Sequence, residues 1–286
     1  MENTITLNNG VEMPLLGIGT FRIRPEDAEK SVEYALKNGY RLIDTANLYM
    51  NEKAVGRGIK KSGVPREGIF VTTKLWPTEY PFEQAKKAID DTLKRLDTEY
   101  VDLLLLHQDV GDIEGAWKAM EQAVDAGKVK AIGISNFSDK TMQRILSVCR
   151  IKPAVLQTEC HPYLQETALK ERLSKDGIHI MAWYPLGSAN KKLLNEEVFT
   201  RLAKKYNKSN VQIILRWHTQ AGNIVIPGSK NQSHIQSNGH IFDFELTRDE
   251  MKEINALNKN KHYAAIPAFI KKLLFTRGNR DYNKQL

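Results

Sequence analysis

Polar residues with reactive side chains end three of the short apolar runs in this sequence. Asp44 ends the run 41–44, Lys74 ends the run 69–74, and His107 ends the run 101–107. Tyr49 follows Asp44 by five residues, close enough for its side chain to return to the same place. An acid, a cation, a neutral ring and a phenol together are suited to protonating a carbonyl oxygen as it gains charge.

In this interpretation Tyr49 is the general acid. A phenol with a pKa of about 10 is a poor acid at neutral pH unless its anion is stabilised. A buried Lys74 ammonium would stabilise that anion, Asp44 would keep the lysine charged, and His107 would hydrogen-bond the substrate oxygen. None of these side chains can supply a hydride, so the hypothesis requires a cofactor.

Other interpretations of the same residues stay open at this point. Asp44 and Lys74 could form a structural ion pair, and His107 could be a core histidine. Glycoside hydrolysis would need two acids at strand ends, for which Asp44 and Glu159 qualify only by position. Metalloprotease, serine-hydrolase and P-loop motifs are missing from the sequence, and the two cysteines have no zinc-ligand spacing. We therefore predict no metal site.

Eight short apolar runs are the candidate strands that would position these residues. They are rich in β-branched residues and do not alternate strictly, which is typical of parallel strands buried on both faces. The runs lie at 15–20, 41–44, 69–74, 101–107, 131–135, 155–159, 179–183 and 224–227. Amphipathic stretches predict helices at 25–38, 82–96, 113–126, 140–149, 196–206 and 209–220, and a capping box at 247–250 begins a later one.

This alternation predicts an α/β fold, a (β/α)8 TIM barrel in one domain that spans residues 1–286. An N-terminal β-hairpin at about 4–13 would cap the barrel, which runs from about 15 to 260. The tail, 261–286, would form a C-terminal loop over the barrel mouth. An open doubly wound sheet is the alternative, but its GxGxxG fingerprint fails here, because Arg22 stands where the third glycine is required.

In such a barrel the working residues lie at the carboxyl ends of the strands. Polar residues that end buried runs are costly unless they are paired or in use. Besides the reactive set, this rule selects Thr20, Ser135, Asn136, Gln157, Trp183 and Ser229.

Composition narrows the class of protein without naming a function. The chain has 286 residues, 41% of them hydrophobic, and a formal net charge of +8. Basic residues are scattered without interleaved aromatics, so we expect no nucleic-acid groove and ascribe most tail charges, including Lys271, to solvated surface. The apolar run 103–106 is far too short for a membrane span, and the first residues do not resemble a signal peptide. We expect a cytoplasmic monomer.

Several segments resemble motifs of the aldo-keto reductase family. Two of them are Asp-Thr-Ala-Asn-Leu-Tyr-Met-Asn-Glu at 44–52 and Thr-Thr-Lys-Leu-Trp at 72–76. Others lie at 103–107, 131–137, 157–162, 182–187 and 226–229, and all occur in the family's order. The resemblance implies an NAD(P)H-dependent carbonyl reductase on a (β/α)8 barrel without a Rossmann domain.

The resemblance also implies roles for individual positions. Tyr49 would be the general acid, Lys74 and Asp44 would tune it, and His107 would orient the carbonyl. Ser135, Asn136 and Gln157 would hold the carboxamide of the cofactor, and Trp183 would stack on its nicotinamide ring. Further cofactor contacts would be Thr20, Leu186, Ser188, Ile226, Ser229, Lys230, His234 and Asn238. Phe21 and Trp76, with His107, would border a small aldehyde, ketoaldehyde or ketone.

The sequence departs from the family pattern where the cofactor's 2′-phosphate would bind. Members often carry Lys after Ile-Pro and Arg six residues later, whereas this chain has Gly228 and His234. Lys230 is near enough in sequence to compensate, so NADPH is favoured and NAD is possible. The alternative functions are a reductase-like nucleotide-binding or regulatory protein with little turnover, and a metal-free barrel hydrolase. The intact set of Asp44, Tyr49, Lys74 and His107 argues against a protein that only binds the nucleotide.

Overall fold

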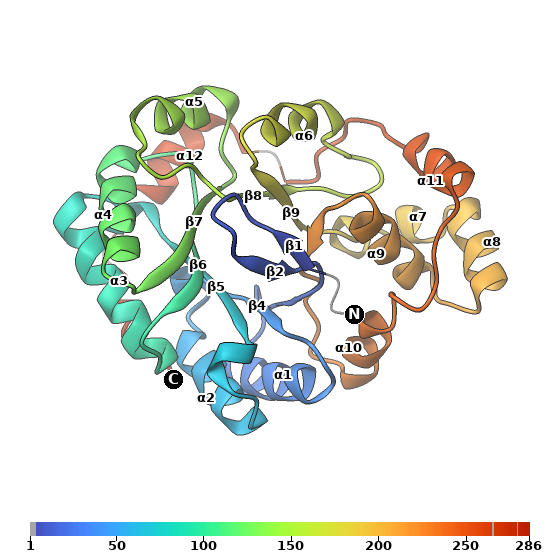
Figure 1. Ribbon diagram of the computed structural model, residues 1–286, viewed down its shortest axis with the longest axis horizontal. Helices are drawn as coiled ribbons and strands as arrows, with labels where there is room; N and C mark the ends of the chain where they lie inside the picture. Colours follow the sequence, from blue (N-terminus) through green and yellow to red (C-terminus); the bar gives the residue numbers. More distant parts are fainter. Residues whose placement is uncertain (1–3, 265, 279) are drawn as a thin grey trace.

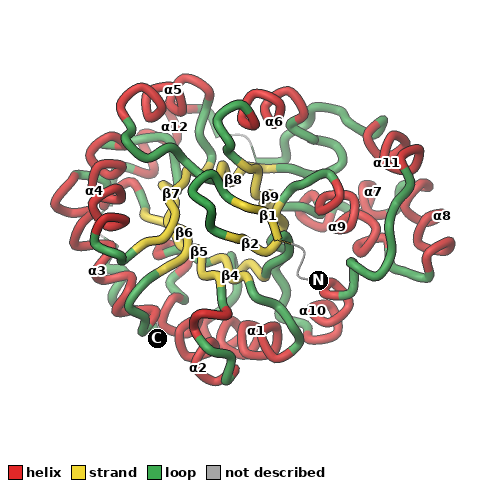
Figure 2. Tube along the Cα trace, viewed as in Figure 1, coloured by secondary structure: helices red, strands yellow, loops and turns green. Residues whose placement is uncertain are grey.

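The computed structural model describes residues 4–264, 266–278 and 280–286, and its centre is a parallel barrel (Figures 1 and 2). The eight strands are ordered β3 to β10 around the sheet. Parallel bridges from Leu16 to Val225 and from Gly19 to Gly228 join the first strand to the last and close the sheet. The predicted barrel is therefore confirmed, and the open-sheet alternative is wrong. The strands are β3 (Ile18–Gly19), β4 (Leu42–Asp44), β5 (Phe70–Leu75), β6 (Val101–Leu106), β7 (Val129–Ser135), β8 (Val155–Glu159), β9 (His179–Trp183) and β10 (Ile224–Val225).

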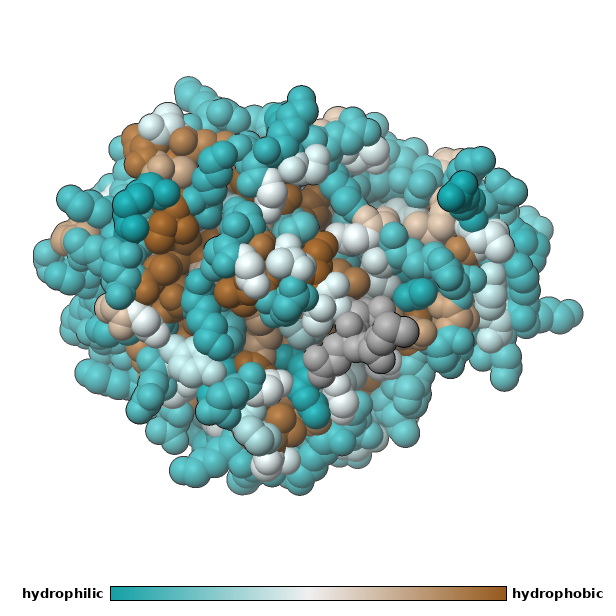
Figure 3. All heavy atoms as spheres, viewed as in Figure 1, coloured by the Kyte–Doolittle hydropathy of each residue, from teal (hydrophilic) through white to brown (hydrophobic). Residues whose placement is uncertain are grey.

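A hairpin covers the amino-terminal end of the barrel. Its strands β1 (Thr4–Thr6) and β2 (Glu12–Pro14) pair antiparallel, as the sequence predicted. Leu7 and Met13 are buried against residues near the starts of the barrel strands, including Leu42 and Phe70. In Figure 1 the hairpin lies in front of the barrel, and Figure 3 shows that this face is largely hydrophilic, with apolar side chains grouped near its centre. The carboxyl ends of the strands therefore form the mouth on the opposite side.

Helices surround the barrel, and all of the predicted ones are present. Ser209 with Gln212 and Thr247 with Glu250 form capping boxes that begin two of them, the second as predicted. The helices that match predictions are α1 (Pro25–Lys37), α3 (Phe82–Leu96), α4 (Ile113–Asp125), α5 (Asp139–Val148), α8 (Glu197–Tyr206), α9 (Asn210–Gln220) and α11 (Arg248–Asn255).

Several helices were not predicted, and α2 shows why. It carries Gly56 and Gly58, which read as helix breakers in sequence. In the structure a Cβ on Gly56 would stand 2.5 Å from the Leu96 carbonyl oxygen, so the glycine allows close packing on α3. The unpredicted helices are α2 (Glu52–Ser62), α6 (Thr167–Ser174), α7 (Lys191–Leu194), α10 (Gln232–Gly239) and α12 (Ala268–Phe275), together with the 3-10 turns η1 (Asn47–Tyr49), η2 (Arg66–Gly68), η3 (Pro77–Glu79) and η4 (Gly187–Ala189).

The carboxyl-terminal tail lies against the mouth, but it is not a simple loop. It contains α12, and the ring of Phe275 lies 4.9 Å from that of Trp76 at the end of β5. Lys271 is only 18% exposed and lies 3.2 Å from the Asp109 carboxylate, so its prediction as solvated surface is wrong. Farther on, Asn283 accepts a hydrogen bond of 2.8 Å from Arg95. These contacts bind the tail to the barrel mouth and to α3.

The part of the chain that the structure describes contains neither a membrane-spanning helix nor a cluster of metal-ligating side chains. No helix there is long and apolar enough to cross a membrane. Nor does any group of three or more His, Cys, Asp or Glu side chains there come together as a metal site would require.

Candidate active site

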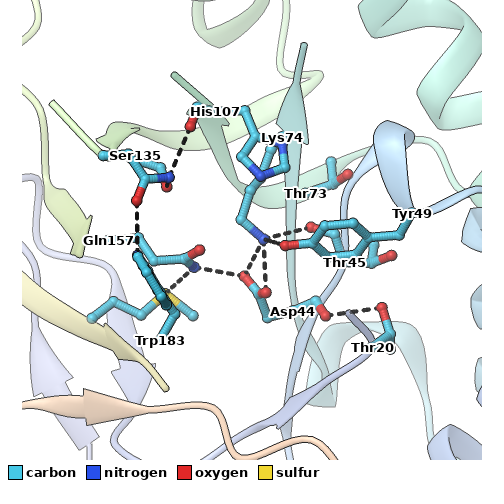
Figure 4. Close-up of polar contacts among 12 residues, drawn as sticks. Thr20, Asp44, Thr45, Tyr49, Thr73, Lys74, His107, Ser135, Gln157 and Trp183 are labelled. Carbon is cyan, nitrogen blue, oxygen red and sulfur yellow. Dashed lines mark hydrogen bonds and ion pairs between the residues drawn. The ribbon is translucent and has the colours of Figure 1, made fainter. Parts of the chain in front are cut away.

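Asp44, Tyr49, Lys74 and His107 meet at the mouth (Figure 4). The Lys74 ammonium donates to both Asp44 carboxylate oxygens, at 2.7 and 2.9 Å. It also donates to the Thr45 carbonyl oxygen at 2.8 Å and to the Tyr49 hydroxyl oxygen at 3.2 Å. The Lys74 side chain has no solvent exposure, so its charge is balanced by these oxygens and by the nearby Glu52 carboxylate.

The loop after β4 brings Tyr49 back over the end of its own strand. Residues 47–49 form the 3-10 turn η1, and Met50 then takes the left-handed conformation, with φ 58°. The buried Asn51 side chain donates to the carbonyl oxygens of Thr20 at 2.9 Å and Ile23 at 3.0 Å. The turn is thereby fixed to the loop after β3, and the phenol is held beside Lys74.

Burial dominates the acid–base properties of this cluster. It raises the pKa of the Asp44 carboxyl and lowers the pKa of the Lys74 ammonium, while their mutual attraction opposes both shifts. Burial also raises the pKa of Tyr49 well above its usual 10, and the Asp44 charge adds to this rise. Burial therefore outweighs Lys74 in setting this pKa, and stabilisation of the phenolate by Lys74 stays a prediction. Tyr49 is protonated at neutral pH, and Lys74 is placed to bond its oxygen once the proton has left.

His107 is neutral in this environment. Burial first, and the nearby Lys74 charge second, lower the pKa of His107 well below its usual 6.5. Its ring stands at 78° to the Tyr49 ring and at 90° to the Trp76 ring, with centroids 5.6 and 5.0 Å away. Its buried Nδ1 has no hydrogen-bond partner among the described residues. A neutral imidazole can donate to an oxygen without carrying a charge of its own.

A row of amide groups extends from the cluster toward Trp183 (Figure 4). Gln157 Nε2 donates to Asp44 at 2.8 Å, and Asn136 Nδ2 donates to the Ser135 hydroxyl at 3.0 Å. Asn136 Oδ1 accepts from the Trp183 indole at 2.9 Å and so fixes the orientation of that ring. A fixed, half-buried indole flanked by hydroxyl and amide groups fits a planar ring that bears a carboxamide. These residues would hold the nicotinamide of a cofactor.

The other predicted cofactor residues lie on three neighbouring loops. Thr20 is buried and donates to the Asp44 carbonyl oxygen at 3.2 Å. Leu186 and Ser188 follow β9, and Ser188 is exposed with φ 55°. Ile226, Ser229, Lys230, His234 and Asn238 follow β10, either before α10 or within it.

The cofactor's phosphate end would meet the start of α10. His234 is exposed in the first turn of this helix, and Lys230 lies 3.9 Å from Asp27 with 73% exposure. A Cβ on Gly228 would lie 3.1 Å from the Gly19 carbonyl oxygen, where the barrel closes. Glycine at 228 therefore suits this close approach, and a lysine in its place would be crowded.

Aromatic rings border the site on its open side, as predicted for Phe21 and Trp76. Phe21 is 44% exposed and its ring lies 5.0 Å from that of Tyr49. Trp76 lies between His107 and Phe275. The sequence predicted that residues after Ala264 could border the pocket but did not single out Phe275, because nothing in a single sequence links it to a strand end.

Sequence reasoning also missed the ion pair beside this wall. Asp109 bonds Lys271 at 3.2 Å and the Ser138 N–H at 3.1 Å, and Lys271 also donates to the Asn136 carbonyl oxygen at 3.3 Å. Asp109 could have been found from its place just after the strand end at His107. Lys271 is 162 residues away, and no local pattern marks it.

Comparison with known proteins identifies the family. The model of the Aldo/keto reductase family matches residues 15–259. The chain belongs to this family. It is 43% identical over 269 residues to the glyoxal reductase of Bacillus subtilis, covering 93% of this chain and 97% of that protein. It is 41% identical over 268 residues to the 9,11-endoperoxide prostaglandin H2 reductase of Trypanosoma cruzi, covering 93% and 95%.

Solved structures of family members have the same fold. An aldo-keto reductase from a Medee basin deep-sea metagenome library superposes with a TM-score of 0.89 at 41% identity, covering 91% of this chain and 97% of that one. The Bombyx mori aldo-keto reductase in complex with NADP gives a TM-score of 0.88 at 33% identity, covering 94% and 97%. This aldo-keto reductase is therefore an NAD(P)H-dependent oxidoreductase that reduces carbonyl groups. The predicted family and enzyme class are confirmed, while the roles of individual residues stay predictions.

Proposed function

We propose that the protein reduces a small aldehyde, ketoaldehyde or ketone to an alcohol, with Tyr49 as proton donor and NADPH as preferred cofactor. The observation that carries this proposal is the 3.2 Å hydrogen bond from the Lys74 ammonium to the Tyr49 hydroxyl oxygen. Since the ammonium occupies a lone pair of that oxygen, the phenol's own proton is free to bond a different acceptor. Bound NADPH would supply the hydride to the carbonyl carbon.

The chain's own residues then handle the proton. The carbonyl oxygen becomes more basic as its carbon is reduced, and it takes the proton from Tyr49. The phenolate left behind accepts from Lys74, whose charge is held by Asp44 at 2.7 Å. Neutral His107 donates to the same carbonyl oxygen and orients it. The Tyr49 proton is regained from solvent after the alcohol leaves.

The lining of the site supports a small carbonyl substrate. Phe21, Trp76 and Phe275 provide apolar walls near Tyr49 and His107, and the Arg22 guanidinium lies 5.1 Å from the centre of the Phe21 ring. The glyoxal reductase relative acts, by its name, on a small dicarbonyl. We therefore infer that small aldehydes and ketoaldehydes are better substrates than extended carbonyl compounds.

NADPH as the preferred cofactor is supported by basic groups near the start of α10. Lys230 and the exposed His234 lie there, together with the first N–H groups of the helix. The Bombyx mori relative was solved with NADP. Because this chain has Gly228 and His234 where family members often have lysine and arginine, we expect its preference for NADPH over NADH to be smaller but not reversed. We also propose a cytoplasmic location, which the unpaired Cys149 and Cys160 favour, and a monomer stays a prediction from the sequence.

A direct assay tests the proposal. Oxidation of NADPH or NADH is followed by the loss of its near-ultraviolet absorbance, with glyoxal, methylglyoxal, a nitrobenzaldehyde and simple ketones as substrates. We expect turnover with the small aldehydes and a lower KM for NADPH than for NADH. If neither cofactor is oxidised with any carbonyl, although both bind, the protein is the nucleotide-binding alternative with little turnover.

A further inference from the structure

Two short turns at the barrel mouth are joined by one partly buried hydrogen bond. Asn47 begins η1, which carries Tyr49, and Glu79 ends η3, which follows Trp76. Asn47 Nδ2 donates to the Glu79 carboxylate. The Asn47 side chain is completely buried, and its Oδ1 has no partner within the described parts of the chain. Glu79 therefore provides the hydrogen bond that anchors this amide.

The bond from Asn47 to Glu79 fixes the start of η1, whereas the two Asn51 bonds fix the chain just after it, and both matter because η1 is weak by itself. A single 3-10 turn has poor hydrogen-bond geometry, and here the backbone contributes bonds of 3.1 Å from the N–H groups of Tyr49 and Met50. The bond from Lys74 to Tyr49 is already long for a charged donor, at 3.2 Å. A small displacement of the turn would break it, and misplacement of a catalytic group by about 1 Å can reduce turnover by about 100-fold.

Glu79 lacks an ion-pair partner of its own among the described residues. Arg95 attracts the Glu79 carboxylate, but its guanidinium bonds Glu52 at 2.6 Å and Asn283 at 2.8 Å. Burial raises the pKa of Glu79 to about 7, and the attraction of Arg95 only partly opposes this. The titratable and charged groups that face it are Glu52 from α2, Asp91, Arg95 and Lys87 from α3, Tyr80 beside η3, and Tyr282 from the tail.

We propose that Glu79 is a positioning residue for Tyr49. Its ionised carboxylate holds the Asn47 amide, and protonation of Glu79 loosens the turn that carries the phenol. A carboxylate accepts a stronger hydrogen bond from an amide than a carboxylic acid does. The inference rests on the proposed role of Tyr49 as the proton donor.

The pH dependence of kcat can be assigned to Glu79 for three reasons. The pKa of His107 lies well below 6.5 and that of Tyr49 well above 10, so neither residue titrates near neutral pH. The 2′-phosphate of NADPH titrates there, but it affects all variants equally. Glutamine at 79 has the size of glutamate and accepts from Asn47 at every pH. The difference between the wild type and Glu79→Gln therefore isolates the titration of Glu79.

The experiment measures kcat and KM from about pH 5.5 to about pH 8.5 for wild type, Glu79→Gln, Glu79→Ala and the control Glu83→Gln. Glu83 is exposed on α3, 3.5 Å from Lys86. Rates are divided by the concentration of NADPH-binding sites, so that misfolded protein does not lower the measured kcat. We expect kcat of the wild type and of Glu83→Gln to fall about three- to tenfold as pH falls through about 7. Glu79→Gln lacks this fall, and Glu79→Ala has a low kcat at every pH, while KM changes less than about twofold.

Asn47→Ala supplies the second arm of the test. If Glu79 acts through Asn47, the single variants and the double variant lower kcat by the same factor. Multiplying factors would overturn the proposal, as would a pH profile of Glu79→Gln that matches the wild type. A lower melting temperature with unchanged kcat per site would show a structural role only and would also overturn it. Tyr49→Phe separates the role of Tyr49 from the role of Glu79. If Tyr49→Phe keeps full turnover, Tyr49 is not the proton donor. If Tyr49→Phe loses turnover but Glu79→Gln has the pH profile of the wild type, only the role of Glu79 is refuted.

Discussion

Removal of the Lys74 ammonium leaves a buried carboxylate without its ion-pair partner, and the protein should become less stable as a result. Lys74→Met conserves most of the side-chain volume but leaves the Asp44 carboxylate, 2% exposed, with the 2.8 Å bond from Gln157 as its remaining side-chain partner. Breaking a buried pair by deleting one partner costs about 3 to 5 kcal/mol. The bond from Gln157 favours the lower end, about 3 kcal/mol, which for a chain of this length lowers Tm by roughly 5 °C.

The double variant Asp44→Asn/Lys74→Met distinguishes an unpaired charge from simple loss of packing. It removes both charges, so its loss of stability should be smaller than the loss caused by Lys74→Met alone. The sign of the pH dependence also follows. Burial raises the pKa of the Asp44 carboxyl in the folded state, so this group disfavours folding as pH rises through its titration. The penalty of Lys74→Met therefore grows with rising pH and fades as pH falls toward about 4.

Urea unfolding followed by tryptophan fluorescence, at pH values from about 4 to about 8, measures these differences. The midpoint should fall for Lys74→Met and recover in large part for the double variant. The reasoning is refuted if Lys74→Met costs less than about 1 kcal/mol at pH 7. It is refuted equally if the single-variant losses add up in the double variant.

Three further predictions concern the surroundings of the site. Burial alone would raise the pKa of Glu250, but hydrogen bonds, chiefly from the partly exposed Lys205, lower it to about 2. Glu250→Gln should therefore lower the free energy of unfolding by about 1 kcal/mol above pH 4.5, after discounting for solvent. The difference in thermal stability should vanish as pH falls toward 2. Lys271→Ala removes the tie of α12 to the mouth and should raise KM for aromatic aldehydes about threefold or more with kcat and NADPH affinity nearly constant, whereas unchanged KM would exclude α12 as a wall beside Trp76. His234→Arg should lower the Kd for NADPH about tenfold and leave that for NADH unchanged, as measured by fluorescence quenching; equal effects on both would contradict the assignment of the phosphate end.

The barrel and the centre of the site could be predicted because both follow from one repeated pattern. Strands buried on both faces must be apolar, so the polar residue that ends each run is conspicuous in the sequence. The carboxyl ends of parallel strands gather at one mouth. Asp44, Lys74 and His107 could therefore be placed together before any coordinates were known.

The remaining features depend on contacts that a local pattern does not encode. In the sequence the glycines of α2 argue against a helix. The structure shows that Gly56 is needed because the Leu96 carbonyl oxygen of α3 lies too close for a side chain. The rise in the pKa of Tyr49 comes from burial in its turn, and a sequence does not reveal that burial. Lys271 and Glu79 act through partners on other elements, so periodicity gives no sign of them.

The central claim is that Tyr49 donates the proton to the carbonyl oxygen, and Tyr49→Phe tests it most directly. The change deletes one hydroxyl and keeps the ring that packs on Phe21 and His107. NADPH affinity is measured by quenching of tryptophan fluorescence, and kcat is measured with methylglyoxal in the same preparation. We predict an NADPH Kd within about twofold of the wild type and a kcat lower by at least about 100-fold. A variant that binds NADPH normally and retains the wild-type kcat would contradict the account.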